Sequence, residues 1–337
     1  MRRKALPALL AVALAFALPL LLSPAPSART APPAEPETPV PAAETSAPVR
    51  RAVLDETLTL AVRTADGVRE MTMAEYLPAA LAGEMPAAFH PEALRAQAVA
   101  LRSYALHFRA ARKDAHPDAD VCTSPACCAA FADDAALRAR WGAEFARYAS
   151  KMRAAAADTD GQYLVWEDEP ILAVFHAASA GQTEAGGALG VAAPYLVSVP
   201  SPETAETVAA LESTVEVSSA EFRGAVASVA PDAVFGDDPA AWLGAVTRTE
   251  SGRVASVQIG GAAVSGLALR QLFSLRSADF SLAWDGSCFR FSVRGSGHGV
   301  GMSQYGADLL AEGGASYAEI LAHYYPGTRL VIAMAAA

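Results

Sequence analysis

The amino-acid sequence predicts an α+β fold for a folded body at residues 51–337. Hydrophobic residues make up 53% of the 337-residue chain, which is enough to build a core and excludes wholesale disorder. Helical and strand-like patterns alternate along the body without the regular strand–helix–strand order of a parallel sheet. No internal repeat is visible. These observations favour mixed sheets and packed helices in one body.

The N-terminal residues 1–23 predict an export signal or a membrane anchor. Basic residues at positions 2–4 precede an apolar run over 5–22, about the minimum length that crosses a bilayer. Prolines surround the small-residue site at 25–27, which makes cleavage unfavourable, so an uncleaved anchor is favoured over a cleaved signal peptide. The proline-rich residues 24–50 read as a semi-extended linker, with a tail of no spacer role as the alternative. Either way, the body is expected outside the cytoplasm, at the cell membrane.

The first half of the body is expected to contain the longest helix. Pro91 suits a first helical position, and an apolar stripe continues from there to about Arg112. The other elements expected in this half are a strand over 53–62, a short helix over Met73–Leu81 broken at Gly83–Pro86, a Cys-bearing loop over 114–131, a helix over 135–156 and a hairpin over 161–177.

The second half mixes loops with shorter elements. Signals are weak over 203–240. The elements expected are a small-residue loop over 178–187, a hairpin over 252–264, a helix over Leu267–Leu275, a strand over Phe289–Val293, and helices over Ser303–Glu312 and Tyr317–Tyr325.

The charge excludes one class of partner. The chain carries a net charge of −10, and residues 1–30 hold four bases and no acids, so the remainder carries 22 − 36 = −14. Binding to a phosphate backbone needs clustered Lys and Arg. We therefore expect no nucleic-acid partner.

Glu84 is the carboxyl group best placed to act as an acid. It stands in the stretch GEMP, expected to be a non-helical joint before the long helix. Burial in such a joint raises the pKa of a carboxyl, because it disfavours the charged form, and a protonated Glu can donate a proton. Arg95 and Arg102 share a helix face and could bind an anionic substrate. On spacing alone, a turn-capping Glu and a solvated arginine face are favoured instead.

A glycine-rich tract, RGSGHGVGMSQY, runs from Arg294 to Tyr305. Its alternating glycines allow backbone to approach a ligand or other backbone closely. It is not a dinucleotide fingerprint, because Met302 stands where the last glycine is required. His298, with Ser303 and Gln304 at a helix start, suggests hydrogen bonding to a polar ligand, and a tight structural turn is the alternative.

The tract HAASAGQTE offers His176 with the hydroxyls of Ser179 and Thr183. A serine nucleophile is weakly supported, since no G-x-S-x-G elbow surrounds Ser179.

The cysteines are Cys122, Cys127, Cys128 and Cys288. His116 lies six residues before Cys122, so a His/Cys metal site is conceivable. A disulfide or free thiols are favoured over zinc, because the compartment permits disulfides.

Four tracts, in their order along the chain, resemble the stage II sporulation protein D family, which includes amidase enhancers. The match covers roughly Leu58 to Leu330. The tracts are GEMPAAFHPEALRAQAVALRSYA, VFHAASAGQTE with PYLVSVPSP downstream, SGLALRQLFSLRSADF, and GSGHGVGMSQYGADLLAEGGASYAEILAHYYPGTRL.

The resemblance implies a membrane-anchored lytic transglycosylase that cuts peptidoglycan strands already stripped of stem peptides. It implies that Glu84 is the catalytic acid and that Arg95 and Arg102 bind the lactyl carboxylates of the stripped strands. Glu84 would protonate the glycosidic oxygen and then accept the proton of the C6 hydroxyl, giving a 1,6-anhydro sugar without a second carboxylate. No cofactor is required for that chemistry. The other residues expected to bind substrate are Tyr104, His176, Ser179, Thr183, His298, Ser303 and Gln304.

The family pattern also implies a structural zinc in some members, held by two Cys and two His. His116, Cys122 and Cys127 fit three of those positions, while the fourth is Ala126 here, and Cys128 could substitute. A family loop S-x-S-G-G reads AASAG at residues 177–181, which loses one hydroxyl and one glycine.

Two functions from different classes compete. The first is the transglycosylase, acting during engulfment in sporulation with a cell-wall amidase of the stage II sporulation protein P type and a membrane scaffold of the stage II sporulation protein M type. The second is a glycan-binding amidase enhancer that does not cut. Retention of Glu84 with both arginines favours the enzyme, and the dense polar tracts disfavour a purely structural cell-wall protein.

Overall fold

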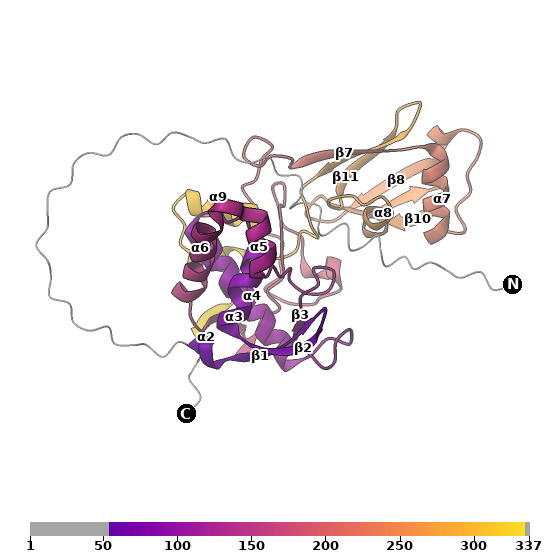
Figure 1. Cartoon of the computed structure of the whole chain (residues 1–337). Coiled ribbons are helices and arrows are strands. Elements are labelled where there is room, and N and C mark those ends of the chain that lie inside the picture. Colours follow the sequence, from indigo (N-terminus) through magenta and orange to yellow (C-terminus); the bar gives the residue numbers. More distant parts are fainter. Residues whose placement is uncertain (1–53, 334–337) are drawn as a thin grey trace, which may run out of the picture.

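The computed structural model describes residues 54–333, in which helices and strands are mixed as the sequence predicts. They form two lobes side by side, each with its own hydrophobic core (Figure 1). The first lobe comprises residues 54–211 and 295–333, and the second, residues 212–294, is inserted between them. The predicted anchor and linker lie outside the described residues. Within residues 54–333, no helix has the length and apolar character needed to span a membrane.

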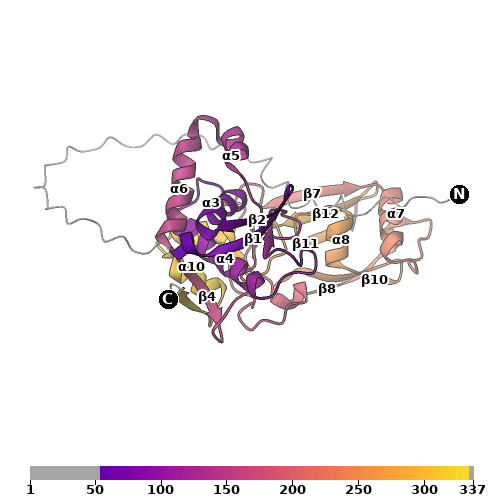
Figure 2. The same cartoon turned by 60° about the horizontal axis from the view of Figure 1, so that its bottom comes forward.

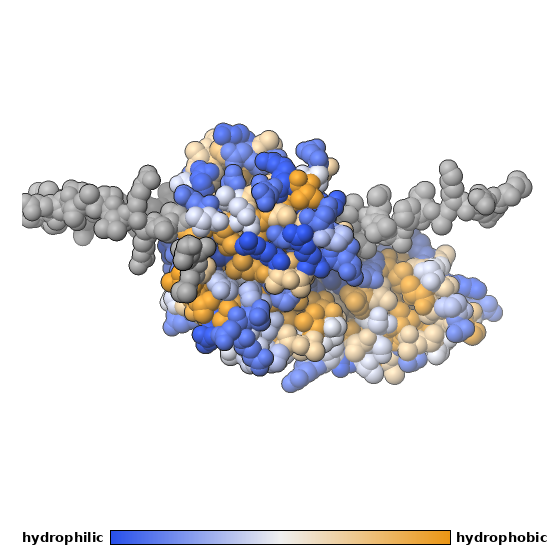
Figure 3. Space-filling view, turned by 90° about the horizontal axis from the view of Figure 1, so that it is seen from below, coloured by the Kyte–Doolittle hydropathy of each residue, from blue (hydrophilic) through white to orange (hydrophobic). Residues whose placement is uncertain are grey.

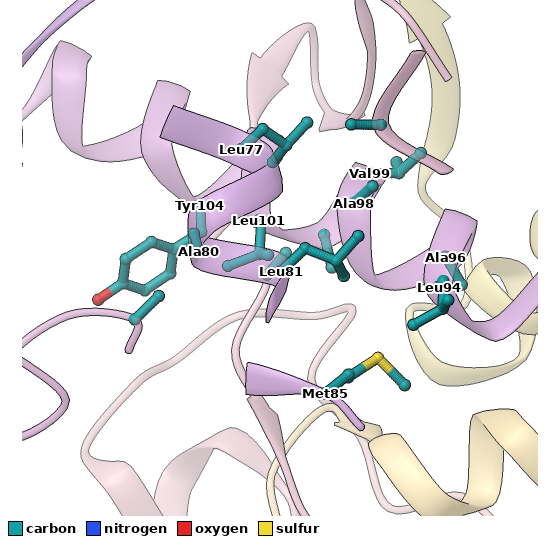
Figure 4. Close-up of a cluster of buried hydrophobic side chains, with 14 of the residues drawn as sticks. Leu77, Ala80, Leu81, Met85, Leu94, Ala96, Ala98, Val99, Leu101 and Tyr104 are labelled. Carbon is teal, nitrogen blue, oxygen red and sulfur yellow. The ribbon is translucent and has the colours of Figure 1, made fainter. Parts of the chain in front are cut away.

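The first lobe is built around α4 (Pro91–Ala110), the long helix that the sequence predicts. His90 caps it and Pro91 takes the first helical position. Its apolar stripe packs on α3, and Leu77, Leu81, Leu94 and Leu101 belong to one buried cluster (Figure 4). The helices around α4 are α3 (Met73–Glu84), α6 (Phe145–Asp158), α9 (Gln304–Glu312) and α10 (Tyr317–Tyr324).

Small sheets close the flanks of this lobe. One has the order β2-β1-β3, with β1 antiparallel to β2 and parallel to β3; a second has the order β14-β4-β5; and β6 pairs in parallel with β13. The strands are β1 (Thr59–Thr64), β2 (Gly67–Thr72), β3 (Val121–Cys122), β4 (Gln162–Trp166), β5 (Glu169–Pro170), β6 (Phe175–His176), β13 (Met302–Ser303) and β14 (Arg329–Ile332).

The strand expected over 53–62 is only half right. Its first part is the short helix α2 (Leu54–Thr57), and β1 begins at Thr59. The carboxylate of Asp160 accepts the N–H groups of Leu54 and Asp55, each at 2.8 Å, and so caps the start of this helix. A residue more than a hundred positions away decides the conformation here.

Two other expected elements are shorter than predicted. The helix over 135–156 is broken at Gly142 (φ +52) into α5 (Asp134–Trp141), the 3₁₀ turn η2 (Gly142–Glu144) and α6. The hairpin over 161–177 retains only β4 and β5, and the chain after Pro170 runs irregularly as far as β6.

The second lobe is an α/β unit with an aromatic core, where Phe222 stacks on Phe289 at 3.9 Å between ring centroids. Its sheets have the orders β11-β12-β7 and β10-β9-β8, and α7 lies at the end remote from the first lobe (Figure 2). The elements are β7 (Glu212–Val217), α7 (Ser219–Val229), the 3₁₀ turn η4 (Pro239–Trp242), β8 (Leu243–Arg248), β9 (Val254–Ile259), β10 (Ala262–Ser265), α8 (Gly266–Leu272), β11 (Asp279–Trp284) and β12 (Phe289–Arg294).

The inserted lobe enters and leaves through one two-stranded stem. β7 and β12 pair antiparallel, with Glu212 opposite Arg294, and the N–H of Gly295 donates to the carbonyl of Leu211 at 2.8 Å. Hydrophilic and hydrophobic residues are interspersed over the face of the molecule shown in Figure 3. The stem brings the glycine-rich tract back to the first lobe directly after the insertion.

Candidate functional site

One pocket of about 380 Å³ lies where the two lobes meet, within the range typical of small-molecule sites. It combines residues from six separate stretches of the chain. Its walls are formed by Gly83, Glu84, Tyr104, Phe108, Lys113, Pro125, Ala126, Cys127, Cys128, Ala129, Ala130, Leu172, Val174, Phe175, His176, Ala177, Arg270, Ser296, Gly297, His298 and Gln304.

Glu84 is the last residue of α3, and not part of a non-helical joint as expected, because the helix continues to the cap at Met85. Its Oε1 accepts the N–H of Ala130, and its Oε2 lies 3.4 Å from the side-chain nitrogen of Gln304. Burial raises the pKa of Glu84 to about 7, against the opposing effect of these two hydrogen bonds. The carboxyl is therefore about half protonated near neutral pH.

Among the described residues that line the pocket, Glu84 is the only carboxylate. The two walls on either side of Glu84 are built in different ways.

One wall, called here the thiol wall, is the loop from Lys113 to Ala130. Its backbone packs tightly on the end of α3, where a Cβ atom added to Gly83 would lie 2.7 Å from the carbonyl carbon of Ala130. This close approach presents the N–H of Ala130 to Glu84. The position of the loop therefore sets the hydrogen bonding of the acid.

The thiol wall contains four side chains that could hold a metal ion. The donor atoms of His116, Cys122, Cys127 and Cys128 all lie within 4.8 Å of one another. A tetrahedral zinc with Zn–S bonds of about 2.3 Å would separate its sulfurs by about 3.8 Å, so the spacing fits. The four cysteines of the chain, all within the described residues, are free thiols.

The orientation of His116 suits a ligand. Its Nδ1 lies 2.9 Å from the carbonyl of Ala119, which fixes the proton on Nδ1, and its Nε2 faces the Sγ of Cys128 at 3.2 Å. Cys128, not a residue at position 126, supplies the fourth donor. The ammonium of Lys113 lies 3.6 Å from the same sulfur, where it offsets thiolate charge.

The other wall, called here the glycine wall, consists of Val174–Glu184 and the turn Gly295–Ser303. β6 and β13 join the two segments, with Ser303 opposite His176. The four alternating glycines all have positive φ, between +71° and +106°. A Cβ at Gly301 would lie 2.0 Å from the carbonyl oxygen of Val174, and one at Gly295 would lie 2.8 Å from that of Ala178, so these two glycines allow backbone to touch backbone.

His176 and His298 are two neutral imidazoles on the glycine wall. Nε2 of His176 accepts from the hydroxyl of Ser179 at 2.5 Å, and Nδ1 of His298 accepts from the N–H of Val300 at 3.1 Å. Burial lowers the pKa of His298 to about 4 and holds that of His176 well below its usual value. Neither ring competes with Glu84 as the acid at neutral pH.

The remaining predicted substrate residues divide into two groups. Tyr104 and Gln304 line the pocket, and their binding of substrate stays a prediction. Thr183, Ser179 and Ser303 are buried and outside its lining: Thr183 bonds to backbone at Val199, Ser179 supports His176, and Ser303 caps α9. Their hydroxyls hold the wall in shape and do not face the pocket, contrary to the substrate-binding role expected for them.

Arg95 and Arg102 are a correction to the sequence prediction, since the structure places neither at the pocket. Arg102 is fully buried, and its Nε and Nη2 bind the Asp55 carboxylate at 2.9 and 2.5 Å. Arg95 binds Asp158 and Glu92 on the outer face of α4. Helical spacing correctly puts both on one stripe but does not reveal which carboxylates engage them.

Three charged residues near the site were not predicted from the sequence. Lys113 and Arg270 line the pocket, and Arg270 comes from α8 of the second lobe. Glu203 lies buried behind the glycine wall, where its carboxylate accepts the N–H of Ser179 at 2.9 Å and the hydroxyl of Ser303. An arginine in the otherwise apolar run GLALRQL is the signal that could have identified Arg270.

Hydrogen bonds hold the second lobe against the glycine wall. The hydroxyls of Thr249 and Ser251 donate to Oε2 of Glu184 at 2.6 and 2.7 Å, and Arg253 donates to the carbonyl of Gln182 at 2.9 Å. These bonds fix the lobe that carries Arg270 relative to Glu84.

Comparisons with known proteins identify a family. The family model described as stage II sporulation protein, SpoIID, matches residues 62–166, which include Glu84 and the thiol wall. Stage II sporulation protein D of Bacillus amyloliquefaciens is 35% identical over 263 residues, covering 77% of this chain and 74% of that protein. Its counterpart in Bacillus subtilis (strain 168) is 33% identical over 272 residues, covering 80% and 77%. An amidase enhancer of the same strain is 59% identical over 46 residues, 14% of this chain and 6% of that protein.

Proposed function

Because this chain belongs to the stage II sporulation protein D family, with a role connected to sporulation and the cell wall, we propose that it is a peptidoglycan lytic transglycosylase. It cuts the bond between N-acetylmuramic acid and N-acetylglucosamine in strands stripped of stem peptides. The observation that carries the proposal is Glu84, whose pKa is raised to about 7 in a pocket that contains no other described carboxylate.

The reaction needs one carboxyl group used twice. Protonated Glu84 donates to the glycosidic oxygen, the C1–O bond breaks, and N-acetylglucosamine leaves with a free C4 hydroxyl. Charge develops at C1 of the muramic unit. Carboxylate Glu84 then accepts the proton of the C6 hydroxyl as that oxygen bonds to C1. The product is a 1,6-anhydro sugar, Glu84 regains its proton, and no water is consumed.

The pocket walls support this use of Glu84. Ala130 and Gln304 hold its two oxygens, so the carboxyl keeps one orientation through both proton transfers. A hydrolase of the two-carboxylate type would need a second acid about 5–10 Å away, and the described lining offers none. Phe108, Phe175 and Leu172 supply apolar surface for sugar rings.

A zinc ion on His116, Cys122, Cys127 and Cys128 is part of the proposal. When bound, it would supply a structural cross-link within the thiol wall. The proton transfers remain those of Glu84.

The location and partners follow from the same proposal. Residues 5–22 would anchor the protein in the cell membrane, with the two lobes outside the cytoplasm. A cell-wall amidase would prepare the substrate by removing stem peptides, and a membrane scaffold would hold the two enzymes together, as partners of the stage II sporulation protein P and M types would.

A second candidate function is amidase enhancement without cutting. The similarity to an amidase enhancer over 46 residues favours it. In that case the pocket would grip glycan, and Glu84 would be dispensable.

The test incubates the purified full-length protein with amidase-stripped peptidoglycan, wild type beside Glu84→Gln, and identifies the released sugars by mass spectrometry. We expect anhydromuramic ends from the wild type and a loss of about 10²- to 10⁴-fold in Glu84→Gln. Reducing ends would contradict the transglycosylase. Glycan binding and amidase stimulation by both proteins, without any release, would establish the enhancer.

A further inference from the structure

The four donor side chains of the thiol wall would give a bound zinc ion a net negative charge. Cysteine ligands bind as thiolates, and a histidine ligand binds as a neutral imidazole. Thiolates from Cys122, Cys127 and Cys128, together with the imidazole of His116, therefore leave a divalent ion with one negative charge in excess. His116, Cys122 and Cys128 are buried, so water offsets little of that charge, and the site is costly without a cation nearby.

The ammonium of Lys113 lies against this donor set. Its Nζ donates to the Sγ of Cys128 at 3.6 Å and to the carbonyl oxygen of Cys127, so it contacts two consecutive donor residues. The Nε2 of His116 faces the same Sγ at 3.2 Å. A hydrogen bond from an ammonium to a thiolate is charge-assisted and stronger than one between neutral groups.

The same ammonium is held in place from the side of the pocket. It donates to the hydroxyl of Tyr104 at 2.7 Å and lies 4.4 Å from the centroid of the Phe108 ring, within the range of cation–π attraction. Tyr104 and Phe108 are one turn apart on α4, and their rings pack edge to face at 4.8 Å between centroids. The three N–H groups of the ammonium are thus engaged by the Tyr104 oxygen, the Cys127 carbonyl and the Cys128 sulfur. These contacts fix the positive charge beside Cys128.

We infer that Lys113 is a positioning residue for the metal: its ammonium supplies the positive charge that a third thiolate requires, so zinc affinity depends on Lys113 as long as Cys128 is a ligand. This inference rests on the zinc that forms part of the proposed function. With a neutral ligand in place of Cys128, the site and its ion together would be neutral, and Lys113 would no longer matter for affinity. A lysine that merely holds the loop would matter equally with either ligand.

The experiment measures zinc affinity by competition with a coloured chelator, using the purified full-length protein under reducing conditions. Lys113→Met removes the charge and keeps a long side chain, and we expect it to weaken zinc binding about 10- to 100-fold. Lys113→Arg, which keeps a positive charge, should retain most of the affinity. Lys151→Met is the matched control, because the Lys151 ammonium also donates to a backbone carbonyl, that of Phe89, outside the thiol wall. It should leave zinc affinity unchanged.

The decisive comparison repeats Lys113→Met in a Cys128→His background, where a neutral imidazole replaces the third thiolate. There the loss of zinc affinity should shrink to within about 2-fold. An equal fold loss in both backgrounds would mean that Lys113 holds the loop without acting through its charge, and it would overturn the inference. Should Cys128→His not fold, Cys128→Ser removes the third thiolate with little change in volume and gives the same comparison.

Cobalt replacement checks the premise that Cys128 is a ligand. The thiolate-to-metal charge-transfer band of the Co²⁺ protein should lose about a third of its intensity in Cys128→Ser, since one of three thiolates is removed. An unchanged band would also overturn the inference.

Zinc affinity and anhydro-sugar release are measured on the same samples, so the two proposals fail separately. Wild type that binds zinc in the expected manner but releases no anhydro sugar refutes the transglycosylase and leaves the role of Lys113 supported. Wild type that releases anhydro sugar but binds no zinc refutes the role of Lys113 and leaves the transglycosylase standing.

Discussion

The two walls beside Glu84 differ in what holds them. The glycine wall is held by the polypeptide itself: β6 pairs with β13, three glycines with positive φ let the two segments touch, and buried hydroxyls such as that of Ser303 bond within it. The thiol wall is held by side chains, four of which converge as donors for an ion. The first wall is complete from the polypeptide alone, whereas the zinc ion proposed above would add a cross-link to the second. The rigidity of the thiol wall would then depend on the metal.

The largest expected effect tests the glycine wall. Gly301→Ala places a Cβ 2.0 Å from the Val174 carbonyl oxygen at a φ of +71°, so we expect a loss of about 4 kcal/mol or more in the free energy of unfolding. Denaturant unfolding measures it. Gly314→Ala is the matched control, with positive φ but open space around it, and should cost only about 1–2 kcal/mol. Equal losses would mean that backbone contact does not hold this wall.

Substitutions of Arg102 and Arg95, which lie outside the pocket, test whether these residues stabilise the fold or bind substrate. Arg102→Met leaves the buried Asp55 without its partner, and we expect a loss of about 3–5 kcal/mol in unfolding free energy with an unchanged KM for stripped strands. Arg95→Met, which breaks a partly exposed pair, should cost less than about 1 kcal/mol. A raised KM in either variant, with an unchanged free energy of unfolding, would mean that the arginine binds substrate after all.

The acid between the walls gives a pH-dependent prediction. The pKa of Glu84 is raised from 4.5 to about 7 in the folded state, so the folded protein retains a proton that the unfolded chain has released. Wild type therefore loses stability as pH rises from about 4.5 to 7. Relative to it, Glu84→Gln should gain up to about 3 kcal/mol at pH 8 and nothing at pH 4. A gain independent of pH, measured by urea unfolding, would contradict the raised pKa.

Removal of the proposed zinc ion should affect the thiol wall and leave the glycine wall unchanged. At free zinc 100 times the dissociation constant, binding should contribute about 2.7 kcal/mol to unfolding free energy, which a chelator removes. In hydrogen exchange, amides of residues 113–130 should lose protection while those of 174–184 and 295–303 keep it. Cys128→Ser should lower the zinc content measured by mass spectrometry, with Cys288→Ser as the control. Equal loss of protection in both walls would show that they are not independent.

The smallest expected effect is a gain. Ala180 adopts φ +59°, a left-handed conformation that costs an alanine about 1–2 kcal/mol. Ala180→Gly should therefore raise the free energy of unfolding by about 1 kcal/mol. Ala185→Gly, at φ −74°, should lower it by about 0.5–1 kcal/mol. A loss in both variants, by calorimetry, would mean that the position is not strained.

Sequence patterns predicted the parts of the site that depend on local chemistry. The first turn of α4 at Pro91, the glycine turn before α9 and the candidacy of Glu84 all follow from neighbouring residues. The ion pair of Arg102 could not be predicted in this way. Its partner Asp55 is 47 residues away, and helical spacing carries no information about contacts at that distance along the chain. Arg270 was missed for a related reason: a different lobe brings it to the pocket.

The single stem of the inserted lobe has a consequence for the order of folding. The first lobe joins segments on both sides of an excursion of roughly 80 residues, and each doubling of an open loop adds about 0.6 kcal/mol to the entropy cost of closing it. Pairing of β7 with β12 shortens that excursion to a few residues, an advantage of about 3 kcal/mol over a disordered insertion. Closing the stem of the lobe that carries Arg270 therefore lowers the entropy cost of bringing together the two parts of the first lobe that form the pocket.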